Sequence, residues 1–345
     1  MDIRASLAAL CGSDGPSGRE DQVAEVALSL LRPLVDEGYR DKFGNVIGVR
    51  RCGKEDAKRV VLDAHLDEVG LVITGAKEGF LSFRAVGGID PRMLPNREVT
   101  ILSQPPRFGL VAVLPPHVQQ PGDANKSTPL SDLYIDAGLT QEEGEALVGT
   151  FVVPKGPFRS LLGERVSAKA LDDRACCAAV ILAAEELAGK NLPLELSYVF
   201  TTMEEVGSQG AVTAAGEIAP DYAVALDVSF AVTPDVPARN CGKMGGGVML
   251  GIAPILDNGE TDRVRRVAKE QELPLQFEVM GGSTGTDADC IAASGSGVRT
   301  VLFSIPQKYM HTPVETVAPE DVKATAELLC AYITDLARDL AKEGN

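Results

Sequence analysis

The segment from Leu194 to Gly210 constrains the fold and the chemistry of this chain more than any other segment of similar length. An alternating apolar run, Leu194 to Phe200, predicts a strand that enters a core. Two adjacent carboxylates, Glu204 and Glu205, follow the end of that strand. Neighbouring residues on an extended chain point to opposite faces, so the two glutamates cannot do the same work. One can bind a metal while the other faces a substrate as a general base, and the alternative is a solvated pair at a strand end.

The elements on both sides of this segment alternate between strand and helix. This alternation predicts an α/β fold with a mostly parallel sheet flanked by helices. The pattern Ser17-Gly-Arg-Glu20 further predicts a capping box at the start of an early helix. The expected strands are 45–50, 59–70, 194–200, 222–227, 248–252, 275–280 and 298–304, and the expected long helices are 172–187, 258–271 and 319–342.

The middle of the chain has a different sequence pattern. Short β-like pieces alternate there with glycine and proline turns about every ten residues, which predicts a small antiparallel barrel or sandwich. We therefore expect a discontinuous catalytic domain, residues 1–67 and 164–345, with an inserted β-barrel-like domain over 68–163. The polar run from Gln119 to Ser131 predicts a loop.

Charge and cysteine usage narrow the possible partners. The chain has 33 basic and 49 acidic residues, a net charge of −16 and no basic block, which argues against nucleic acid or an anionic membrane as a partner. No apolar run approaches the roughly 20 residues of a membrane span. The seven cysteines are scattered and never spaced Cys-x-x-Cys, so we expect free thiols in a reducing cytoplasm.

The chain contains three histidines, and two of them lie in patterns that suit a metal site. His65 is part of His-x-Asp67 at an expected strand end, and His311 precedes Thr-Pro-Val-Glu. Imidazole and carboxylate ligands at strand ends suit a zinc-like divalent ion. A single histidine is otherwise more often a satisfied core residue. His117 has no such pattern and is interpreted as structural or oligomer-related.

Further acidic residues fall at expected element ends. Asp172 and Asp173 stand where a long helix begins, and Asp227 ends the expected strand 222–227. Ligands of open α/β sheets gather at the carboxyl ends of the strands, so these residues can converge although they are far apart in sequence. Each of them alone is weak evidence, since an aspartate at a helix start is usually only a cap.

The ordered motifs together resemble the M42 family of metallo-aminopeptidases. They are Ala64-His-Leu-Asp-Glu-Val-Gly, Lys169-Ala-Leu-Asp-Asp-Arg, Thr202-Met-Glu-Glu-Val-Gly-Ser-Gln-Gly-Ala, Ala225-Leu-Asp-Val and Met310-His-Thr-Pro-Val-Glu. The resemblance covers essentially the whole chain, including the insertion. It implies an enzyme that removes N-terminal residues from short peptides.

The resemblance also implies how the site residues act. It implies two divalent ions per chain, Zn²⁺ or Co²⁺, with Asp172 bridging both, His65 and Asp227 on one ion and Glu205 and His311 on the other. It implies Glu204 as the general base, Asp67 as the residue that orients His65, and a cis peptide bond between Asp172 and Asp173. It further implies dimers, formed through the inserted domain, that build a tetrahedral dodecamer.

Three other interpretations remain open at this point. An aspartyl aminopeptidase is typically longer than this chain, and an M20-type deacylase carries its extra domain after the Glu-Glu motif, whereas the insertion here lies between His65 and Asp172. A non-catalytic, metal-stabilised scaffold predicts loss of the base, yet Glu204 is present. The sequence does not indicate which N-terminal residue is removed. The run Gln119 to Ser131 and the glycine-rich turn 281–287 are candidate borders of the substrate pocket.

Overall fold

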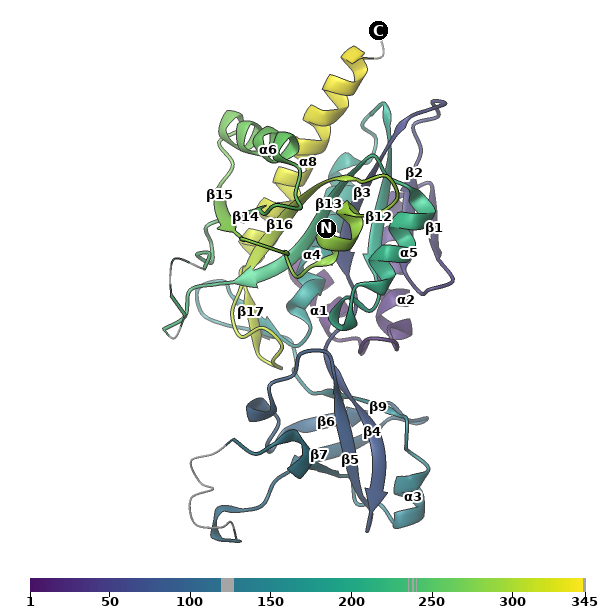
Figure 1. The fold of residues 1–345 in the computed structure, drawn as a ribbon, viewed down its shortest axis with the longest axis vertical. Coiled ribbons are helices and arrows are strands. Elements are labelled where there is room, and N and C mark those ends of the chain that lie inside the picture. The colour runs from purple at the N-terminus through teal and green to yellow at the C-terminus, as the bar shows by residue number, and fades with distance from the viewer. Residues whose placement is uncertain (119–126, 235, 238, 240, 344–345) are drawn as a thin grey trace.

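An eight-stranded sheet forms the centre of the larger part of the molecule (Figure 1). The computed structural model describes residues 1–118, 127–234, 236–237, 239 and 241–343. The strand order is β1-β2-β12-β3-β13-β16-β14-β15, and the four strands from β12 to β16 in that order run parallel to one another. The bounds are β1 (Glu37–Arg40), β2 (Val46–Arg50), β3 (Lys58–His65), β12 (Leu194–Thr201), β13 (Tyr222–Phe230), β14 (Val248–Ile252), β15 (Leu275–Val279) and β16 (Arg299–Gln307).

Helices cover both faces of this sheet. One face packs against α1 (Ile3–Cys11), α2 (Asp21–Leu31), α4 (Leu171–Leu187), α6 (Asn258–Glu270) and α8 (Pro319–Glu343). The other face packs against α5 (Gln209–Ile218) and α7 (Asp287–Ala292). Helix α4 is apolar nearly all round because it lies between the sheet and α8, with almost every side chain buried. The predicted α/β fold with a parallel centre is confirmed.

A second, smaller body of the molecule is a closed antiparallel barrel with the strand order β4-β5-β8-β7-β6-β9 (Figure 1). The bounds are β4 (Gly70–Lys77), β5 (Phe80–Val86), β6 (Glu98–Ile101), β7 (Arg107–Ala112), β8 (Tyr134–Asp136), β9 (Phe151–Pro154) and α3 (Gln141–Glu145). A three-stranded sheet outside the barrel consists of β10 (Arg159–Ser160), β11 (Val166–Ala168) and β17 (Glu315–Val317).

The barrel has an apolar core of its own, separate from the core around the large sheet. Side chains that alternate along its strands point inward and pack together. The barrel therefore buries its own apolar surface. The buried members of this core are Leu71, Ile73, Leu81, Phe83, Leu94, Val99, Ile101, Val111, Leu133, Ile135, Leu147 and Val152.

The described cysteines are all free, as the scattered spacing predicts. Among the described residues we find no helix whose length and hydropathy would let it span a bilayer.

The predicted capping box is wrong. Helix α2 begins at Asp21, and the Ser17 hydroxyl instead donates a hydrogen bond to the buried Asp67 carboxylate at 2.6 Å. The Asp67 carboxylate is fully buried, so protein donors must replace the water that would otherwise solvate it.

Several element ends also differ from the sequence pattern. The chain leaves β3 at His65, and Gly70 already begins the first barrel strand, so the expected strand 59–70 is two strands. Strand β13 does not end at Asp227 but continues to Phe230, because it pairs with β16 that far. Regular helical geometry in α4 begins only after Asp173.

A buried ion-pair network joins the N-terminal segment to the start of α4. The Arg174 side chain is fully buried, and its guanidinium lies 3.1 Å from a carboxylate oxygen of Glu68. Lys169 contacts the same oxygen at 2.6 Å. The guanidinium also donates to three backbone carbonyl oxygens, those of Leu10, Ser13 and Leu66. This network positions the chain that enters α4.

We expect Arg174→Met to lower the free energy of unfolding by about 3–5 kcal/mol, because Glu68 loses a partner and three carbonyl groups lose their donor. Urea unfolding followed by circular dichroism measures this change. Arg92→Met is the matched control, since the Arg92 side chain is 76% exposed and pairs only with Asp90 among the described residues. We expect the control to cost less than about 1 kcal/mol. Equal losses in the two variants would contradict a structural role for the network.

Candidate active site

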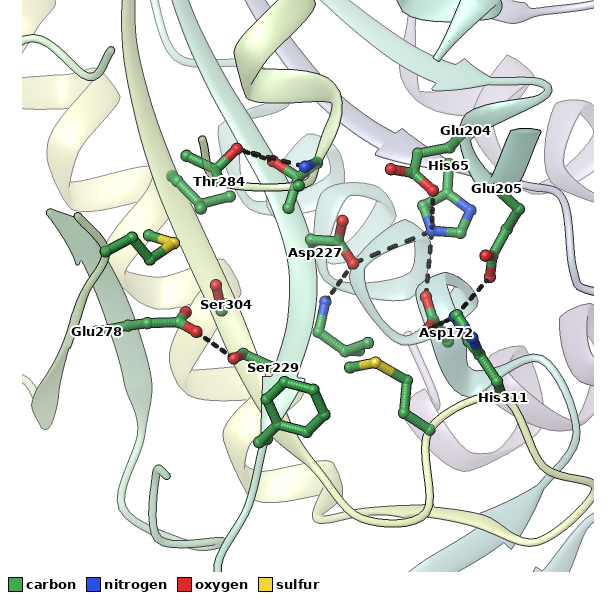
Figure 2. A pocket seen from close by; sticks show the side chains of 17 residues that line it. His65, Asp172, Glu204, Glu205, Asp227, Ser229, Glu278, Thr284, Ser304 and His311 are labelled. Carbon is green, nitrogen blue, oxygen red and sulfur yellow. Dashed lines mark hydrogen bonds and ion pairs between the residues drawn. The ribbon is translucent and has the colours of Figure 1, made fainter. Parts of the chain in front are cut away.

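Five side chains from separate parts of the chain line one pocket of about 230 Å³ (Figure 2). The sheet order explains three of them, because β12, β3 and β13 are neighbours. His65 ends β3, Glu205 follows β12, and Asp227 lies on β13. Asp172 comes from the start of α4 and His311 from the loop after β16. The structure thus brings together all the residues that the sequence predicts as metal ligands, at one edge of the parallel strands.

The Asp172 carboxylate lies between the two imidazoles. Its Oδ1 atom is 3.1 Å from His65 Nε2, and its Oδ2 atom is 3.3 Å from His311 Nε2. His311 Nε2 is also 3.1 Å from Glu205 Oε1. Asp227 is more distant, with Oδ1 at 4.0 Å from His65 Nε2. One carboxylate therefore faces both histidines, each through a different oxygen.

The peptide bond between Asp172 and Asp173 is cis, which confirms that expectation. The Asp172 N–H donates to the buried Glu315 carboxylate at 3.0 Å. Asp173 turns the other way, and its carboxylate accepts the backbone N–H of His65 at 3.2 Å. The two adjacent aspartates therefore act at different places: one faces the pocket and the other fixes the end of β3.

Asp67 contacts more of the site than its expected role of orienting His65 requires. Its Oδ1 atom lies 3.5 Å from His65 Nδ1. Its carboxylate also accepts the backbone N–H groups of Glu204 at 3.0 Å and Glu205 at 3.2 Å, besides the Ser17 hydroxyl. Asp67 therefore holds the turn that carries both glutamates as well as the imidazole.

Sequence reasoning missed two contacts that orient His311. The backbone carbonyl of Gly88, just after barrel strand β5, lies 2.8 Å from His311 Nδ1. The Glu315 carboxylate accepts the His311 backbone N–H at 2.8 Å. The sequence offered a way to find Glu315, because it is the last residue of the motif that begins at Met310. Nothing in the sequence indicated Gly88, because it belongs to the barrel segment and contributes only its backbone carbonyl.

The site concentrates negative charge in a buried place. Burial, and then the neighbouring Asp173, raises the pKa of Asp227 well above its usual range. Burial opposes charging of His311, but its hydrogen bonds to Asp172 and Glu205 outweigh this effect and raise the pKa of that imidazole to about 11. The cluster therefore favours any positive charge that can join it.

The pKa of Glu204 is shifted in the same direction as that of Asp227. Burial is the largest cause, and the nearby carboxylates of Asp287 and Glu205 add to it. Together they raise the pKa of Glu204 to about 8, although His65 opposes the shift. A carboxylate with this pKa can exchange a proton near neutral pH.

Two groups of side chains have ligand atoms close enough to hold an ion. One is His65 with Asp173 and Asp227, and the other is His65 with Asp172 and Glu205; within each group the ligand atoms lie within 4.8 Å of one another. Imidazole and carboxylate donors suit a divalent transition metal. The family resemblance implies a different assignment of ligands to the two ions. In these two groups His65 occurs twice, and Asp173 is a member of one of them.

The rest of the pocket consists mainly of apolar and hydroxyl side chains. The glycine-rich turn 281–287 borders the pocket, as expected, whereas His117 is exposed and does not line it. Residues 119–126 of the predicted loop lie outside the described residues. The remaining lining residues are Glu204, Val228, Ser229, Phe230, Glu278, Met280, Thr284, Gly285, Thr286, Leu302, Ser304 and Met310.

Comparison with known proteins identifies the family. Residues 44–328 match the family model described as M42 glutamyl aminopeptidase. The chain belongs to the M42 peptidase family. This M42 peptidase is accordingly a hydrolase of peptide bonds, which excludes the scaffold interpretation. The match also decides against an aspartyl aminopeptidase or an M20-type deacylase as the family of this chain.

Named relatives resemble the M42 peptidase over nearly its whole length. A lysyl aminopeptidase from Pyrococcus furiosus is 32% identical, with 94% of each chain covered. A TET aminopeptidase structure from a Thaumarchaeota archaeon has a TM-score of 0.92 and 30% identity, with 99% of each chain covered. The TET1 peptidase of Pyrococcus horikoshii, described as assembling into a tetrahedron or a large octahedral shell, has a TM-score of 0.84 and 32% identity, with 97% of this chain and 99% of that chain covered.

Proposed function

We propose that this chain is a two-metal aminopeptidase that releases N-terminal residues from short peptides, with Glu204 as its general base. The observation that carries this proposal is the Asp172 carboxylate, whose two oxygens face two different imidazoles at 3.1 and 3.3 Å. A carboxylate in this position can bridge two ions. His65 and Asp227 would hold one ion, and Glu205 and His311 the other. When bound, the ions would act as Lewis acids on the scissile carbonyl and make water more acidic.

Glu204 is placed to move a proton. It lines the pocket, and its Oε2 atom lies 3.9 Å from His65 Nε2. Because its pKa is raised to about 8, its carboxylate form binds a proton more strongly than an ordinary glutamate does. Glu204 would take the proton of the attacking water and pass it to the leaving amine. Asp67 keeps Glu204 in place through the Glu204 backbone N–H.

The carboxylates near His65 would also select a free N-terminus. A substrate ammonium group that enters the pocket meets several buried carboxylates and, among the described lining residues, no lysine or arginine. An acylated N-terminus is uncharged and cannot form an ion pair with these carboxylates. The pocket chemistry therefore favours cleavage of the first peptide bond over internal bonds.

We also propose a domain division and an assembly. Residues 1–67 and 164–345 would form the catalytic domain, and residues 68–163 an inserted domain that carries subunit contacts. The barrel exposes large apolar side chains, among them Phe80 and Leu110. The capacity of the Pyrococcus horikoshii relative to build closed shells supports a homo-oligomer, and our specific proposal is a dodecamer built from dimers.

Metal analysis tests the ligand and base assignments. We expect the purified protein to bind up to two Zn²⁺ or Co²⁺ ions per chain and to lose activity reversibly with a chelator. Glu204→Gln should keep both ions and lose about 10²–10⁴-fold in kcat, because it removes only the base. His65→Ala and His311→Ala should each lose an ion, whereas His117→Ala, outside the pocket, should lose none. Near-normal turnover of Glu204→Gln would refute its role.

A matched pair of peptides tests the reaction. We expect stepwise release of N-terminal residues from a free tetrapeptide, and at least about 100-fold slower cleavage of its N-acetylated form, equivalent to roughly 2.7 kcal/mol of transition-state stabilisation. A mass-spectrometric time course of both peptides measures the ratio. Faster cleavage of the acetylated peptide would overturn the assignment as an aminopeptidase.

Light scattering tests the assembly. We expect an oligomer at micromolar concentration, and we expect Leu110→Glu to shift it toward smaller species, because a charge on the barrel surface opposes apolar contacts. Leu110 is 43% exposed; Val212→Glu is the control, since Val212 is similarly exposed, at 52%, but lies on α5 beside the large sheet. A wild-type protein that is fully active and only monomeric would contradict the proposal.

A further inference from the structure

The pocket has a second polar end that the proposed mechanism does not use. Glu278 and Ser229 lie there, and Figure 2 shows them across Asp227 from His65. The Ser229 hydroxyl donates a hydrogen bond to the Glu278 carboxylate. Glu278 comes from the edge strand β15 and Ser229 from β13, so the Glu278 side chain reaches over β14 and β16. Its partner on β14 is Gly251, whose missing side chain leaves room for that of Leu302, another lining residue.

The strand register, rather than a loose loop, aims Glu278 at the pocket. Residues two apart on a strand share a face. Glu278 and Met280 both line the pocket. Phe277 and Val279 point to the other face and are 53% and 76% exposed. A glutamate on a sheet edge is usually a solvated residue, but this one turns inward and is held by a buried serine.

The walls between the two ends combine hydroxyl side chains, among them Ser304, with several apolar ones. Phe230, Met280, Leu302 and Met310 line the pocket together with Glu278. Among the described lining residues there is no lysine or arginine, and no ion pair of Glu278 occurs in the described part of the chain. The pocket therefore combines walls rich in apolar side chains with an anionic end that has no positive partner among the described residues.

We propose that Glu278 makes this enzyme select substrates whose N-terminal residue is lysine or arginine. The inference rests on the proposed function, because it assumes that the substrate's free N-terminus lies among the carboxylates near His65. Lysine and arginine pair an apolar stem with a cationic head, which matches the apolar walls and the carboxylate end. An N-terminal glutamate would meet Glu278 with a like charge. Glu278 thus determines specificity and takes no part in bond cleavage.

Matched substrates test this proposal. Lys-Ala-Ala-Ala and norleucine-Ala-Ala-Ala differ chiefly in the terminal ammonium group, and Glu-Ala-Ala-Ala tests the opposite charge. We expect wild-type kcat/KM to be highest for the lysine peptide. Glu278→Gln should lower kcat/KM for the lysine peptide by about 10- to 100-fold, the usual effect of losing a hydrogen bond to a charged group, and change the norleucine value by less than about threefold.

Two further variants complete the test. Glu272→Gln, at an exposed position just before β15, removes the same charge outside the pocket and should leave the lysine-to-norleucine ratio unchanged. Ser229→Ala removes only the hydrogen bond to Glu278 and should lower the ratio by a smaller factor than Glu278→Gln. It therefore keeps the proposal testable if Glu278→Gln does not fold.

Calorimetry provides a readout that does not depend on turnover. Bound to Glu204→Gln, the lysine peptide should have a Kd at least about tenfold lower than the norleucine peptide, and this difference should vanish in the Glu204→Gln, Glu278→Gln double variant. Equal losses on both peptides, or wild-type release of glutamate as fast as lysine, would overturn the role of Glu278. Failure to cleave any free peptide would instead refute the proposed function, while the Kd ratio would still decide whether Glu278 recognises a cation.

Discussion

The structure depends on the concentration of buried carboxylates beside His65 and His311. Burying carboxylates together raises the pKa values of Asp63, Asp173 and Asp227, and the repulsion is relieved when a carboxylate takes up a proton or a positive charge lies beside it. Protons on the imidazoles and divalent ions are alternative sources of that charge. The surrounding fold holds these groups close together against their mutual repulsion, which explains the dense hydrogen bonding around them.

Much of this support comes from residues that do not face the pocket. Asp67 fixes the glutamate turn through backbone N–H groups, and Glu315 fixes both Asp172 and His311 through theirs. The barrel segment contributes the Gly88 carbonyl to His311. The small body of the molecule is therefore connected to the site, and a displacement of the barrel would reach an imidazole directly.

The pocket separates two kinds of chemistry along its length. The end near His65 carries the groups that can bind ions and move a proton, and it comes from the central strands of the sheet. The end near Glu278 includes the edge strand β15 and the glycine-rich turn that follows it. Residues at such an edge can change without disturbing the central strands, so the preference for one side chain can vary while the reaction stays the same.

The sequence alone determined the fold class, the barrel-forming segment and the residues that line the reactive end of the pocket. These could be predicted because alternation, turns and motifs are local patterns, and because the ends of adjacent parallel strands meet at one edge. Only the tertiary structure decided that Ser17 binds Asp67 instead of capping a helix, that Gly88 contacts His311, and that Glu278 reaches Ser229 across two strands. Each of these contacts joins residues at least 49 positions apart, and the packing of loops and strands in the complete fold, which no local pattern encodes, brings them within hydrogen-bonding distance.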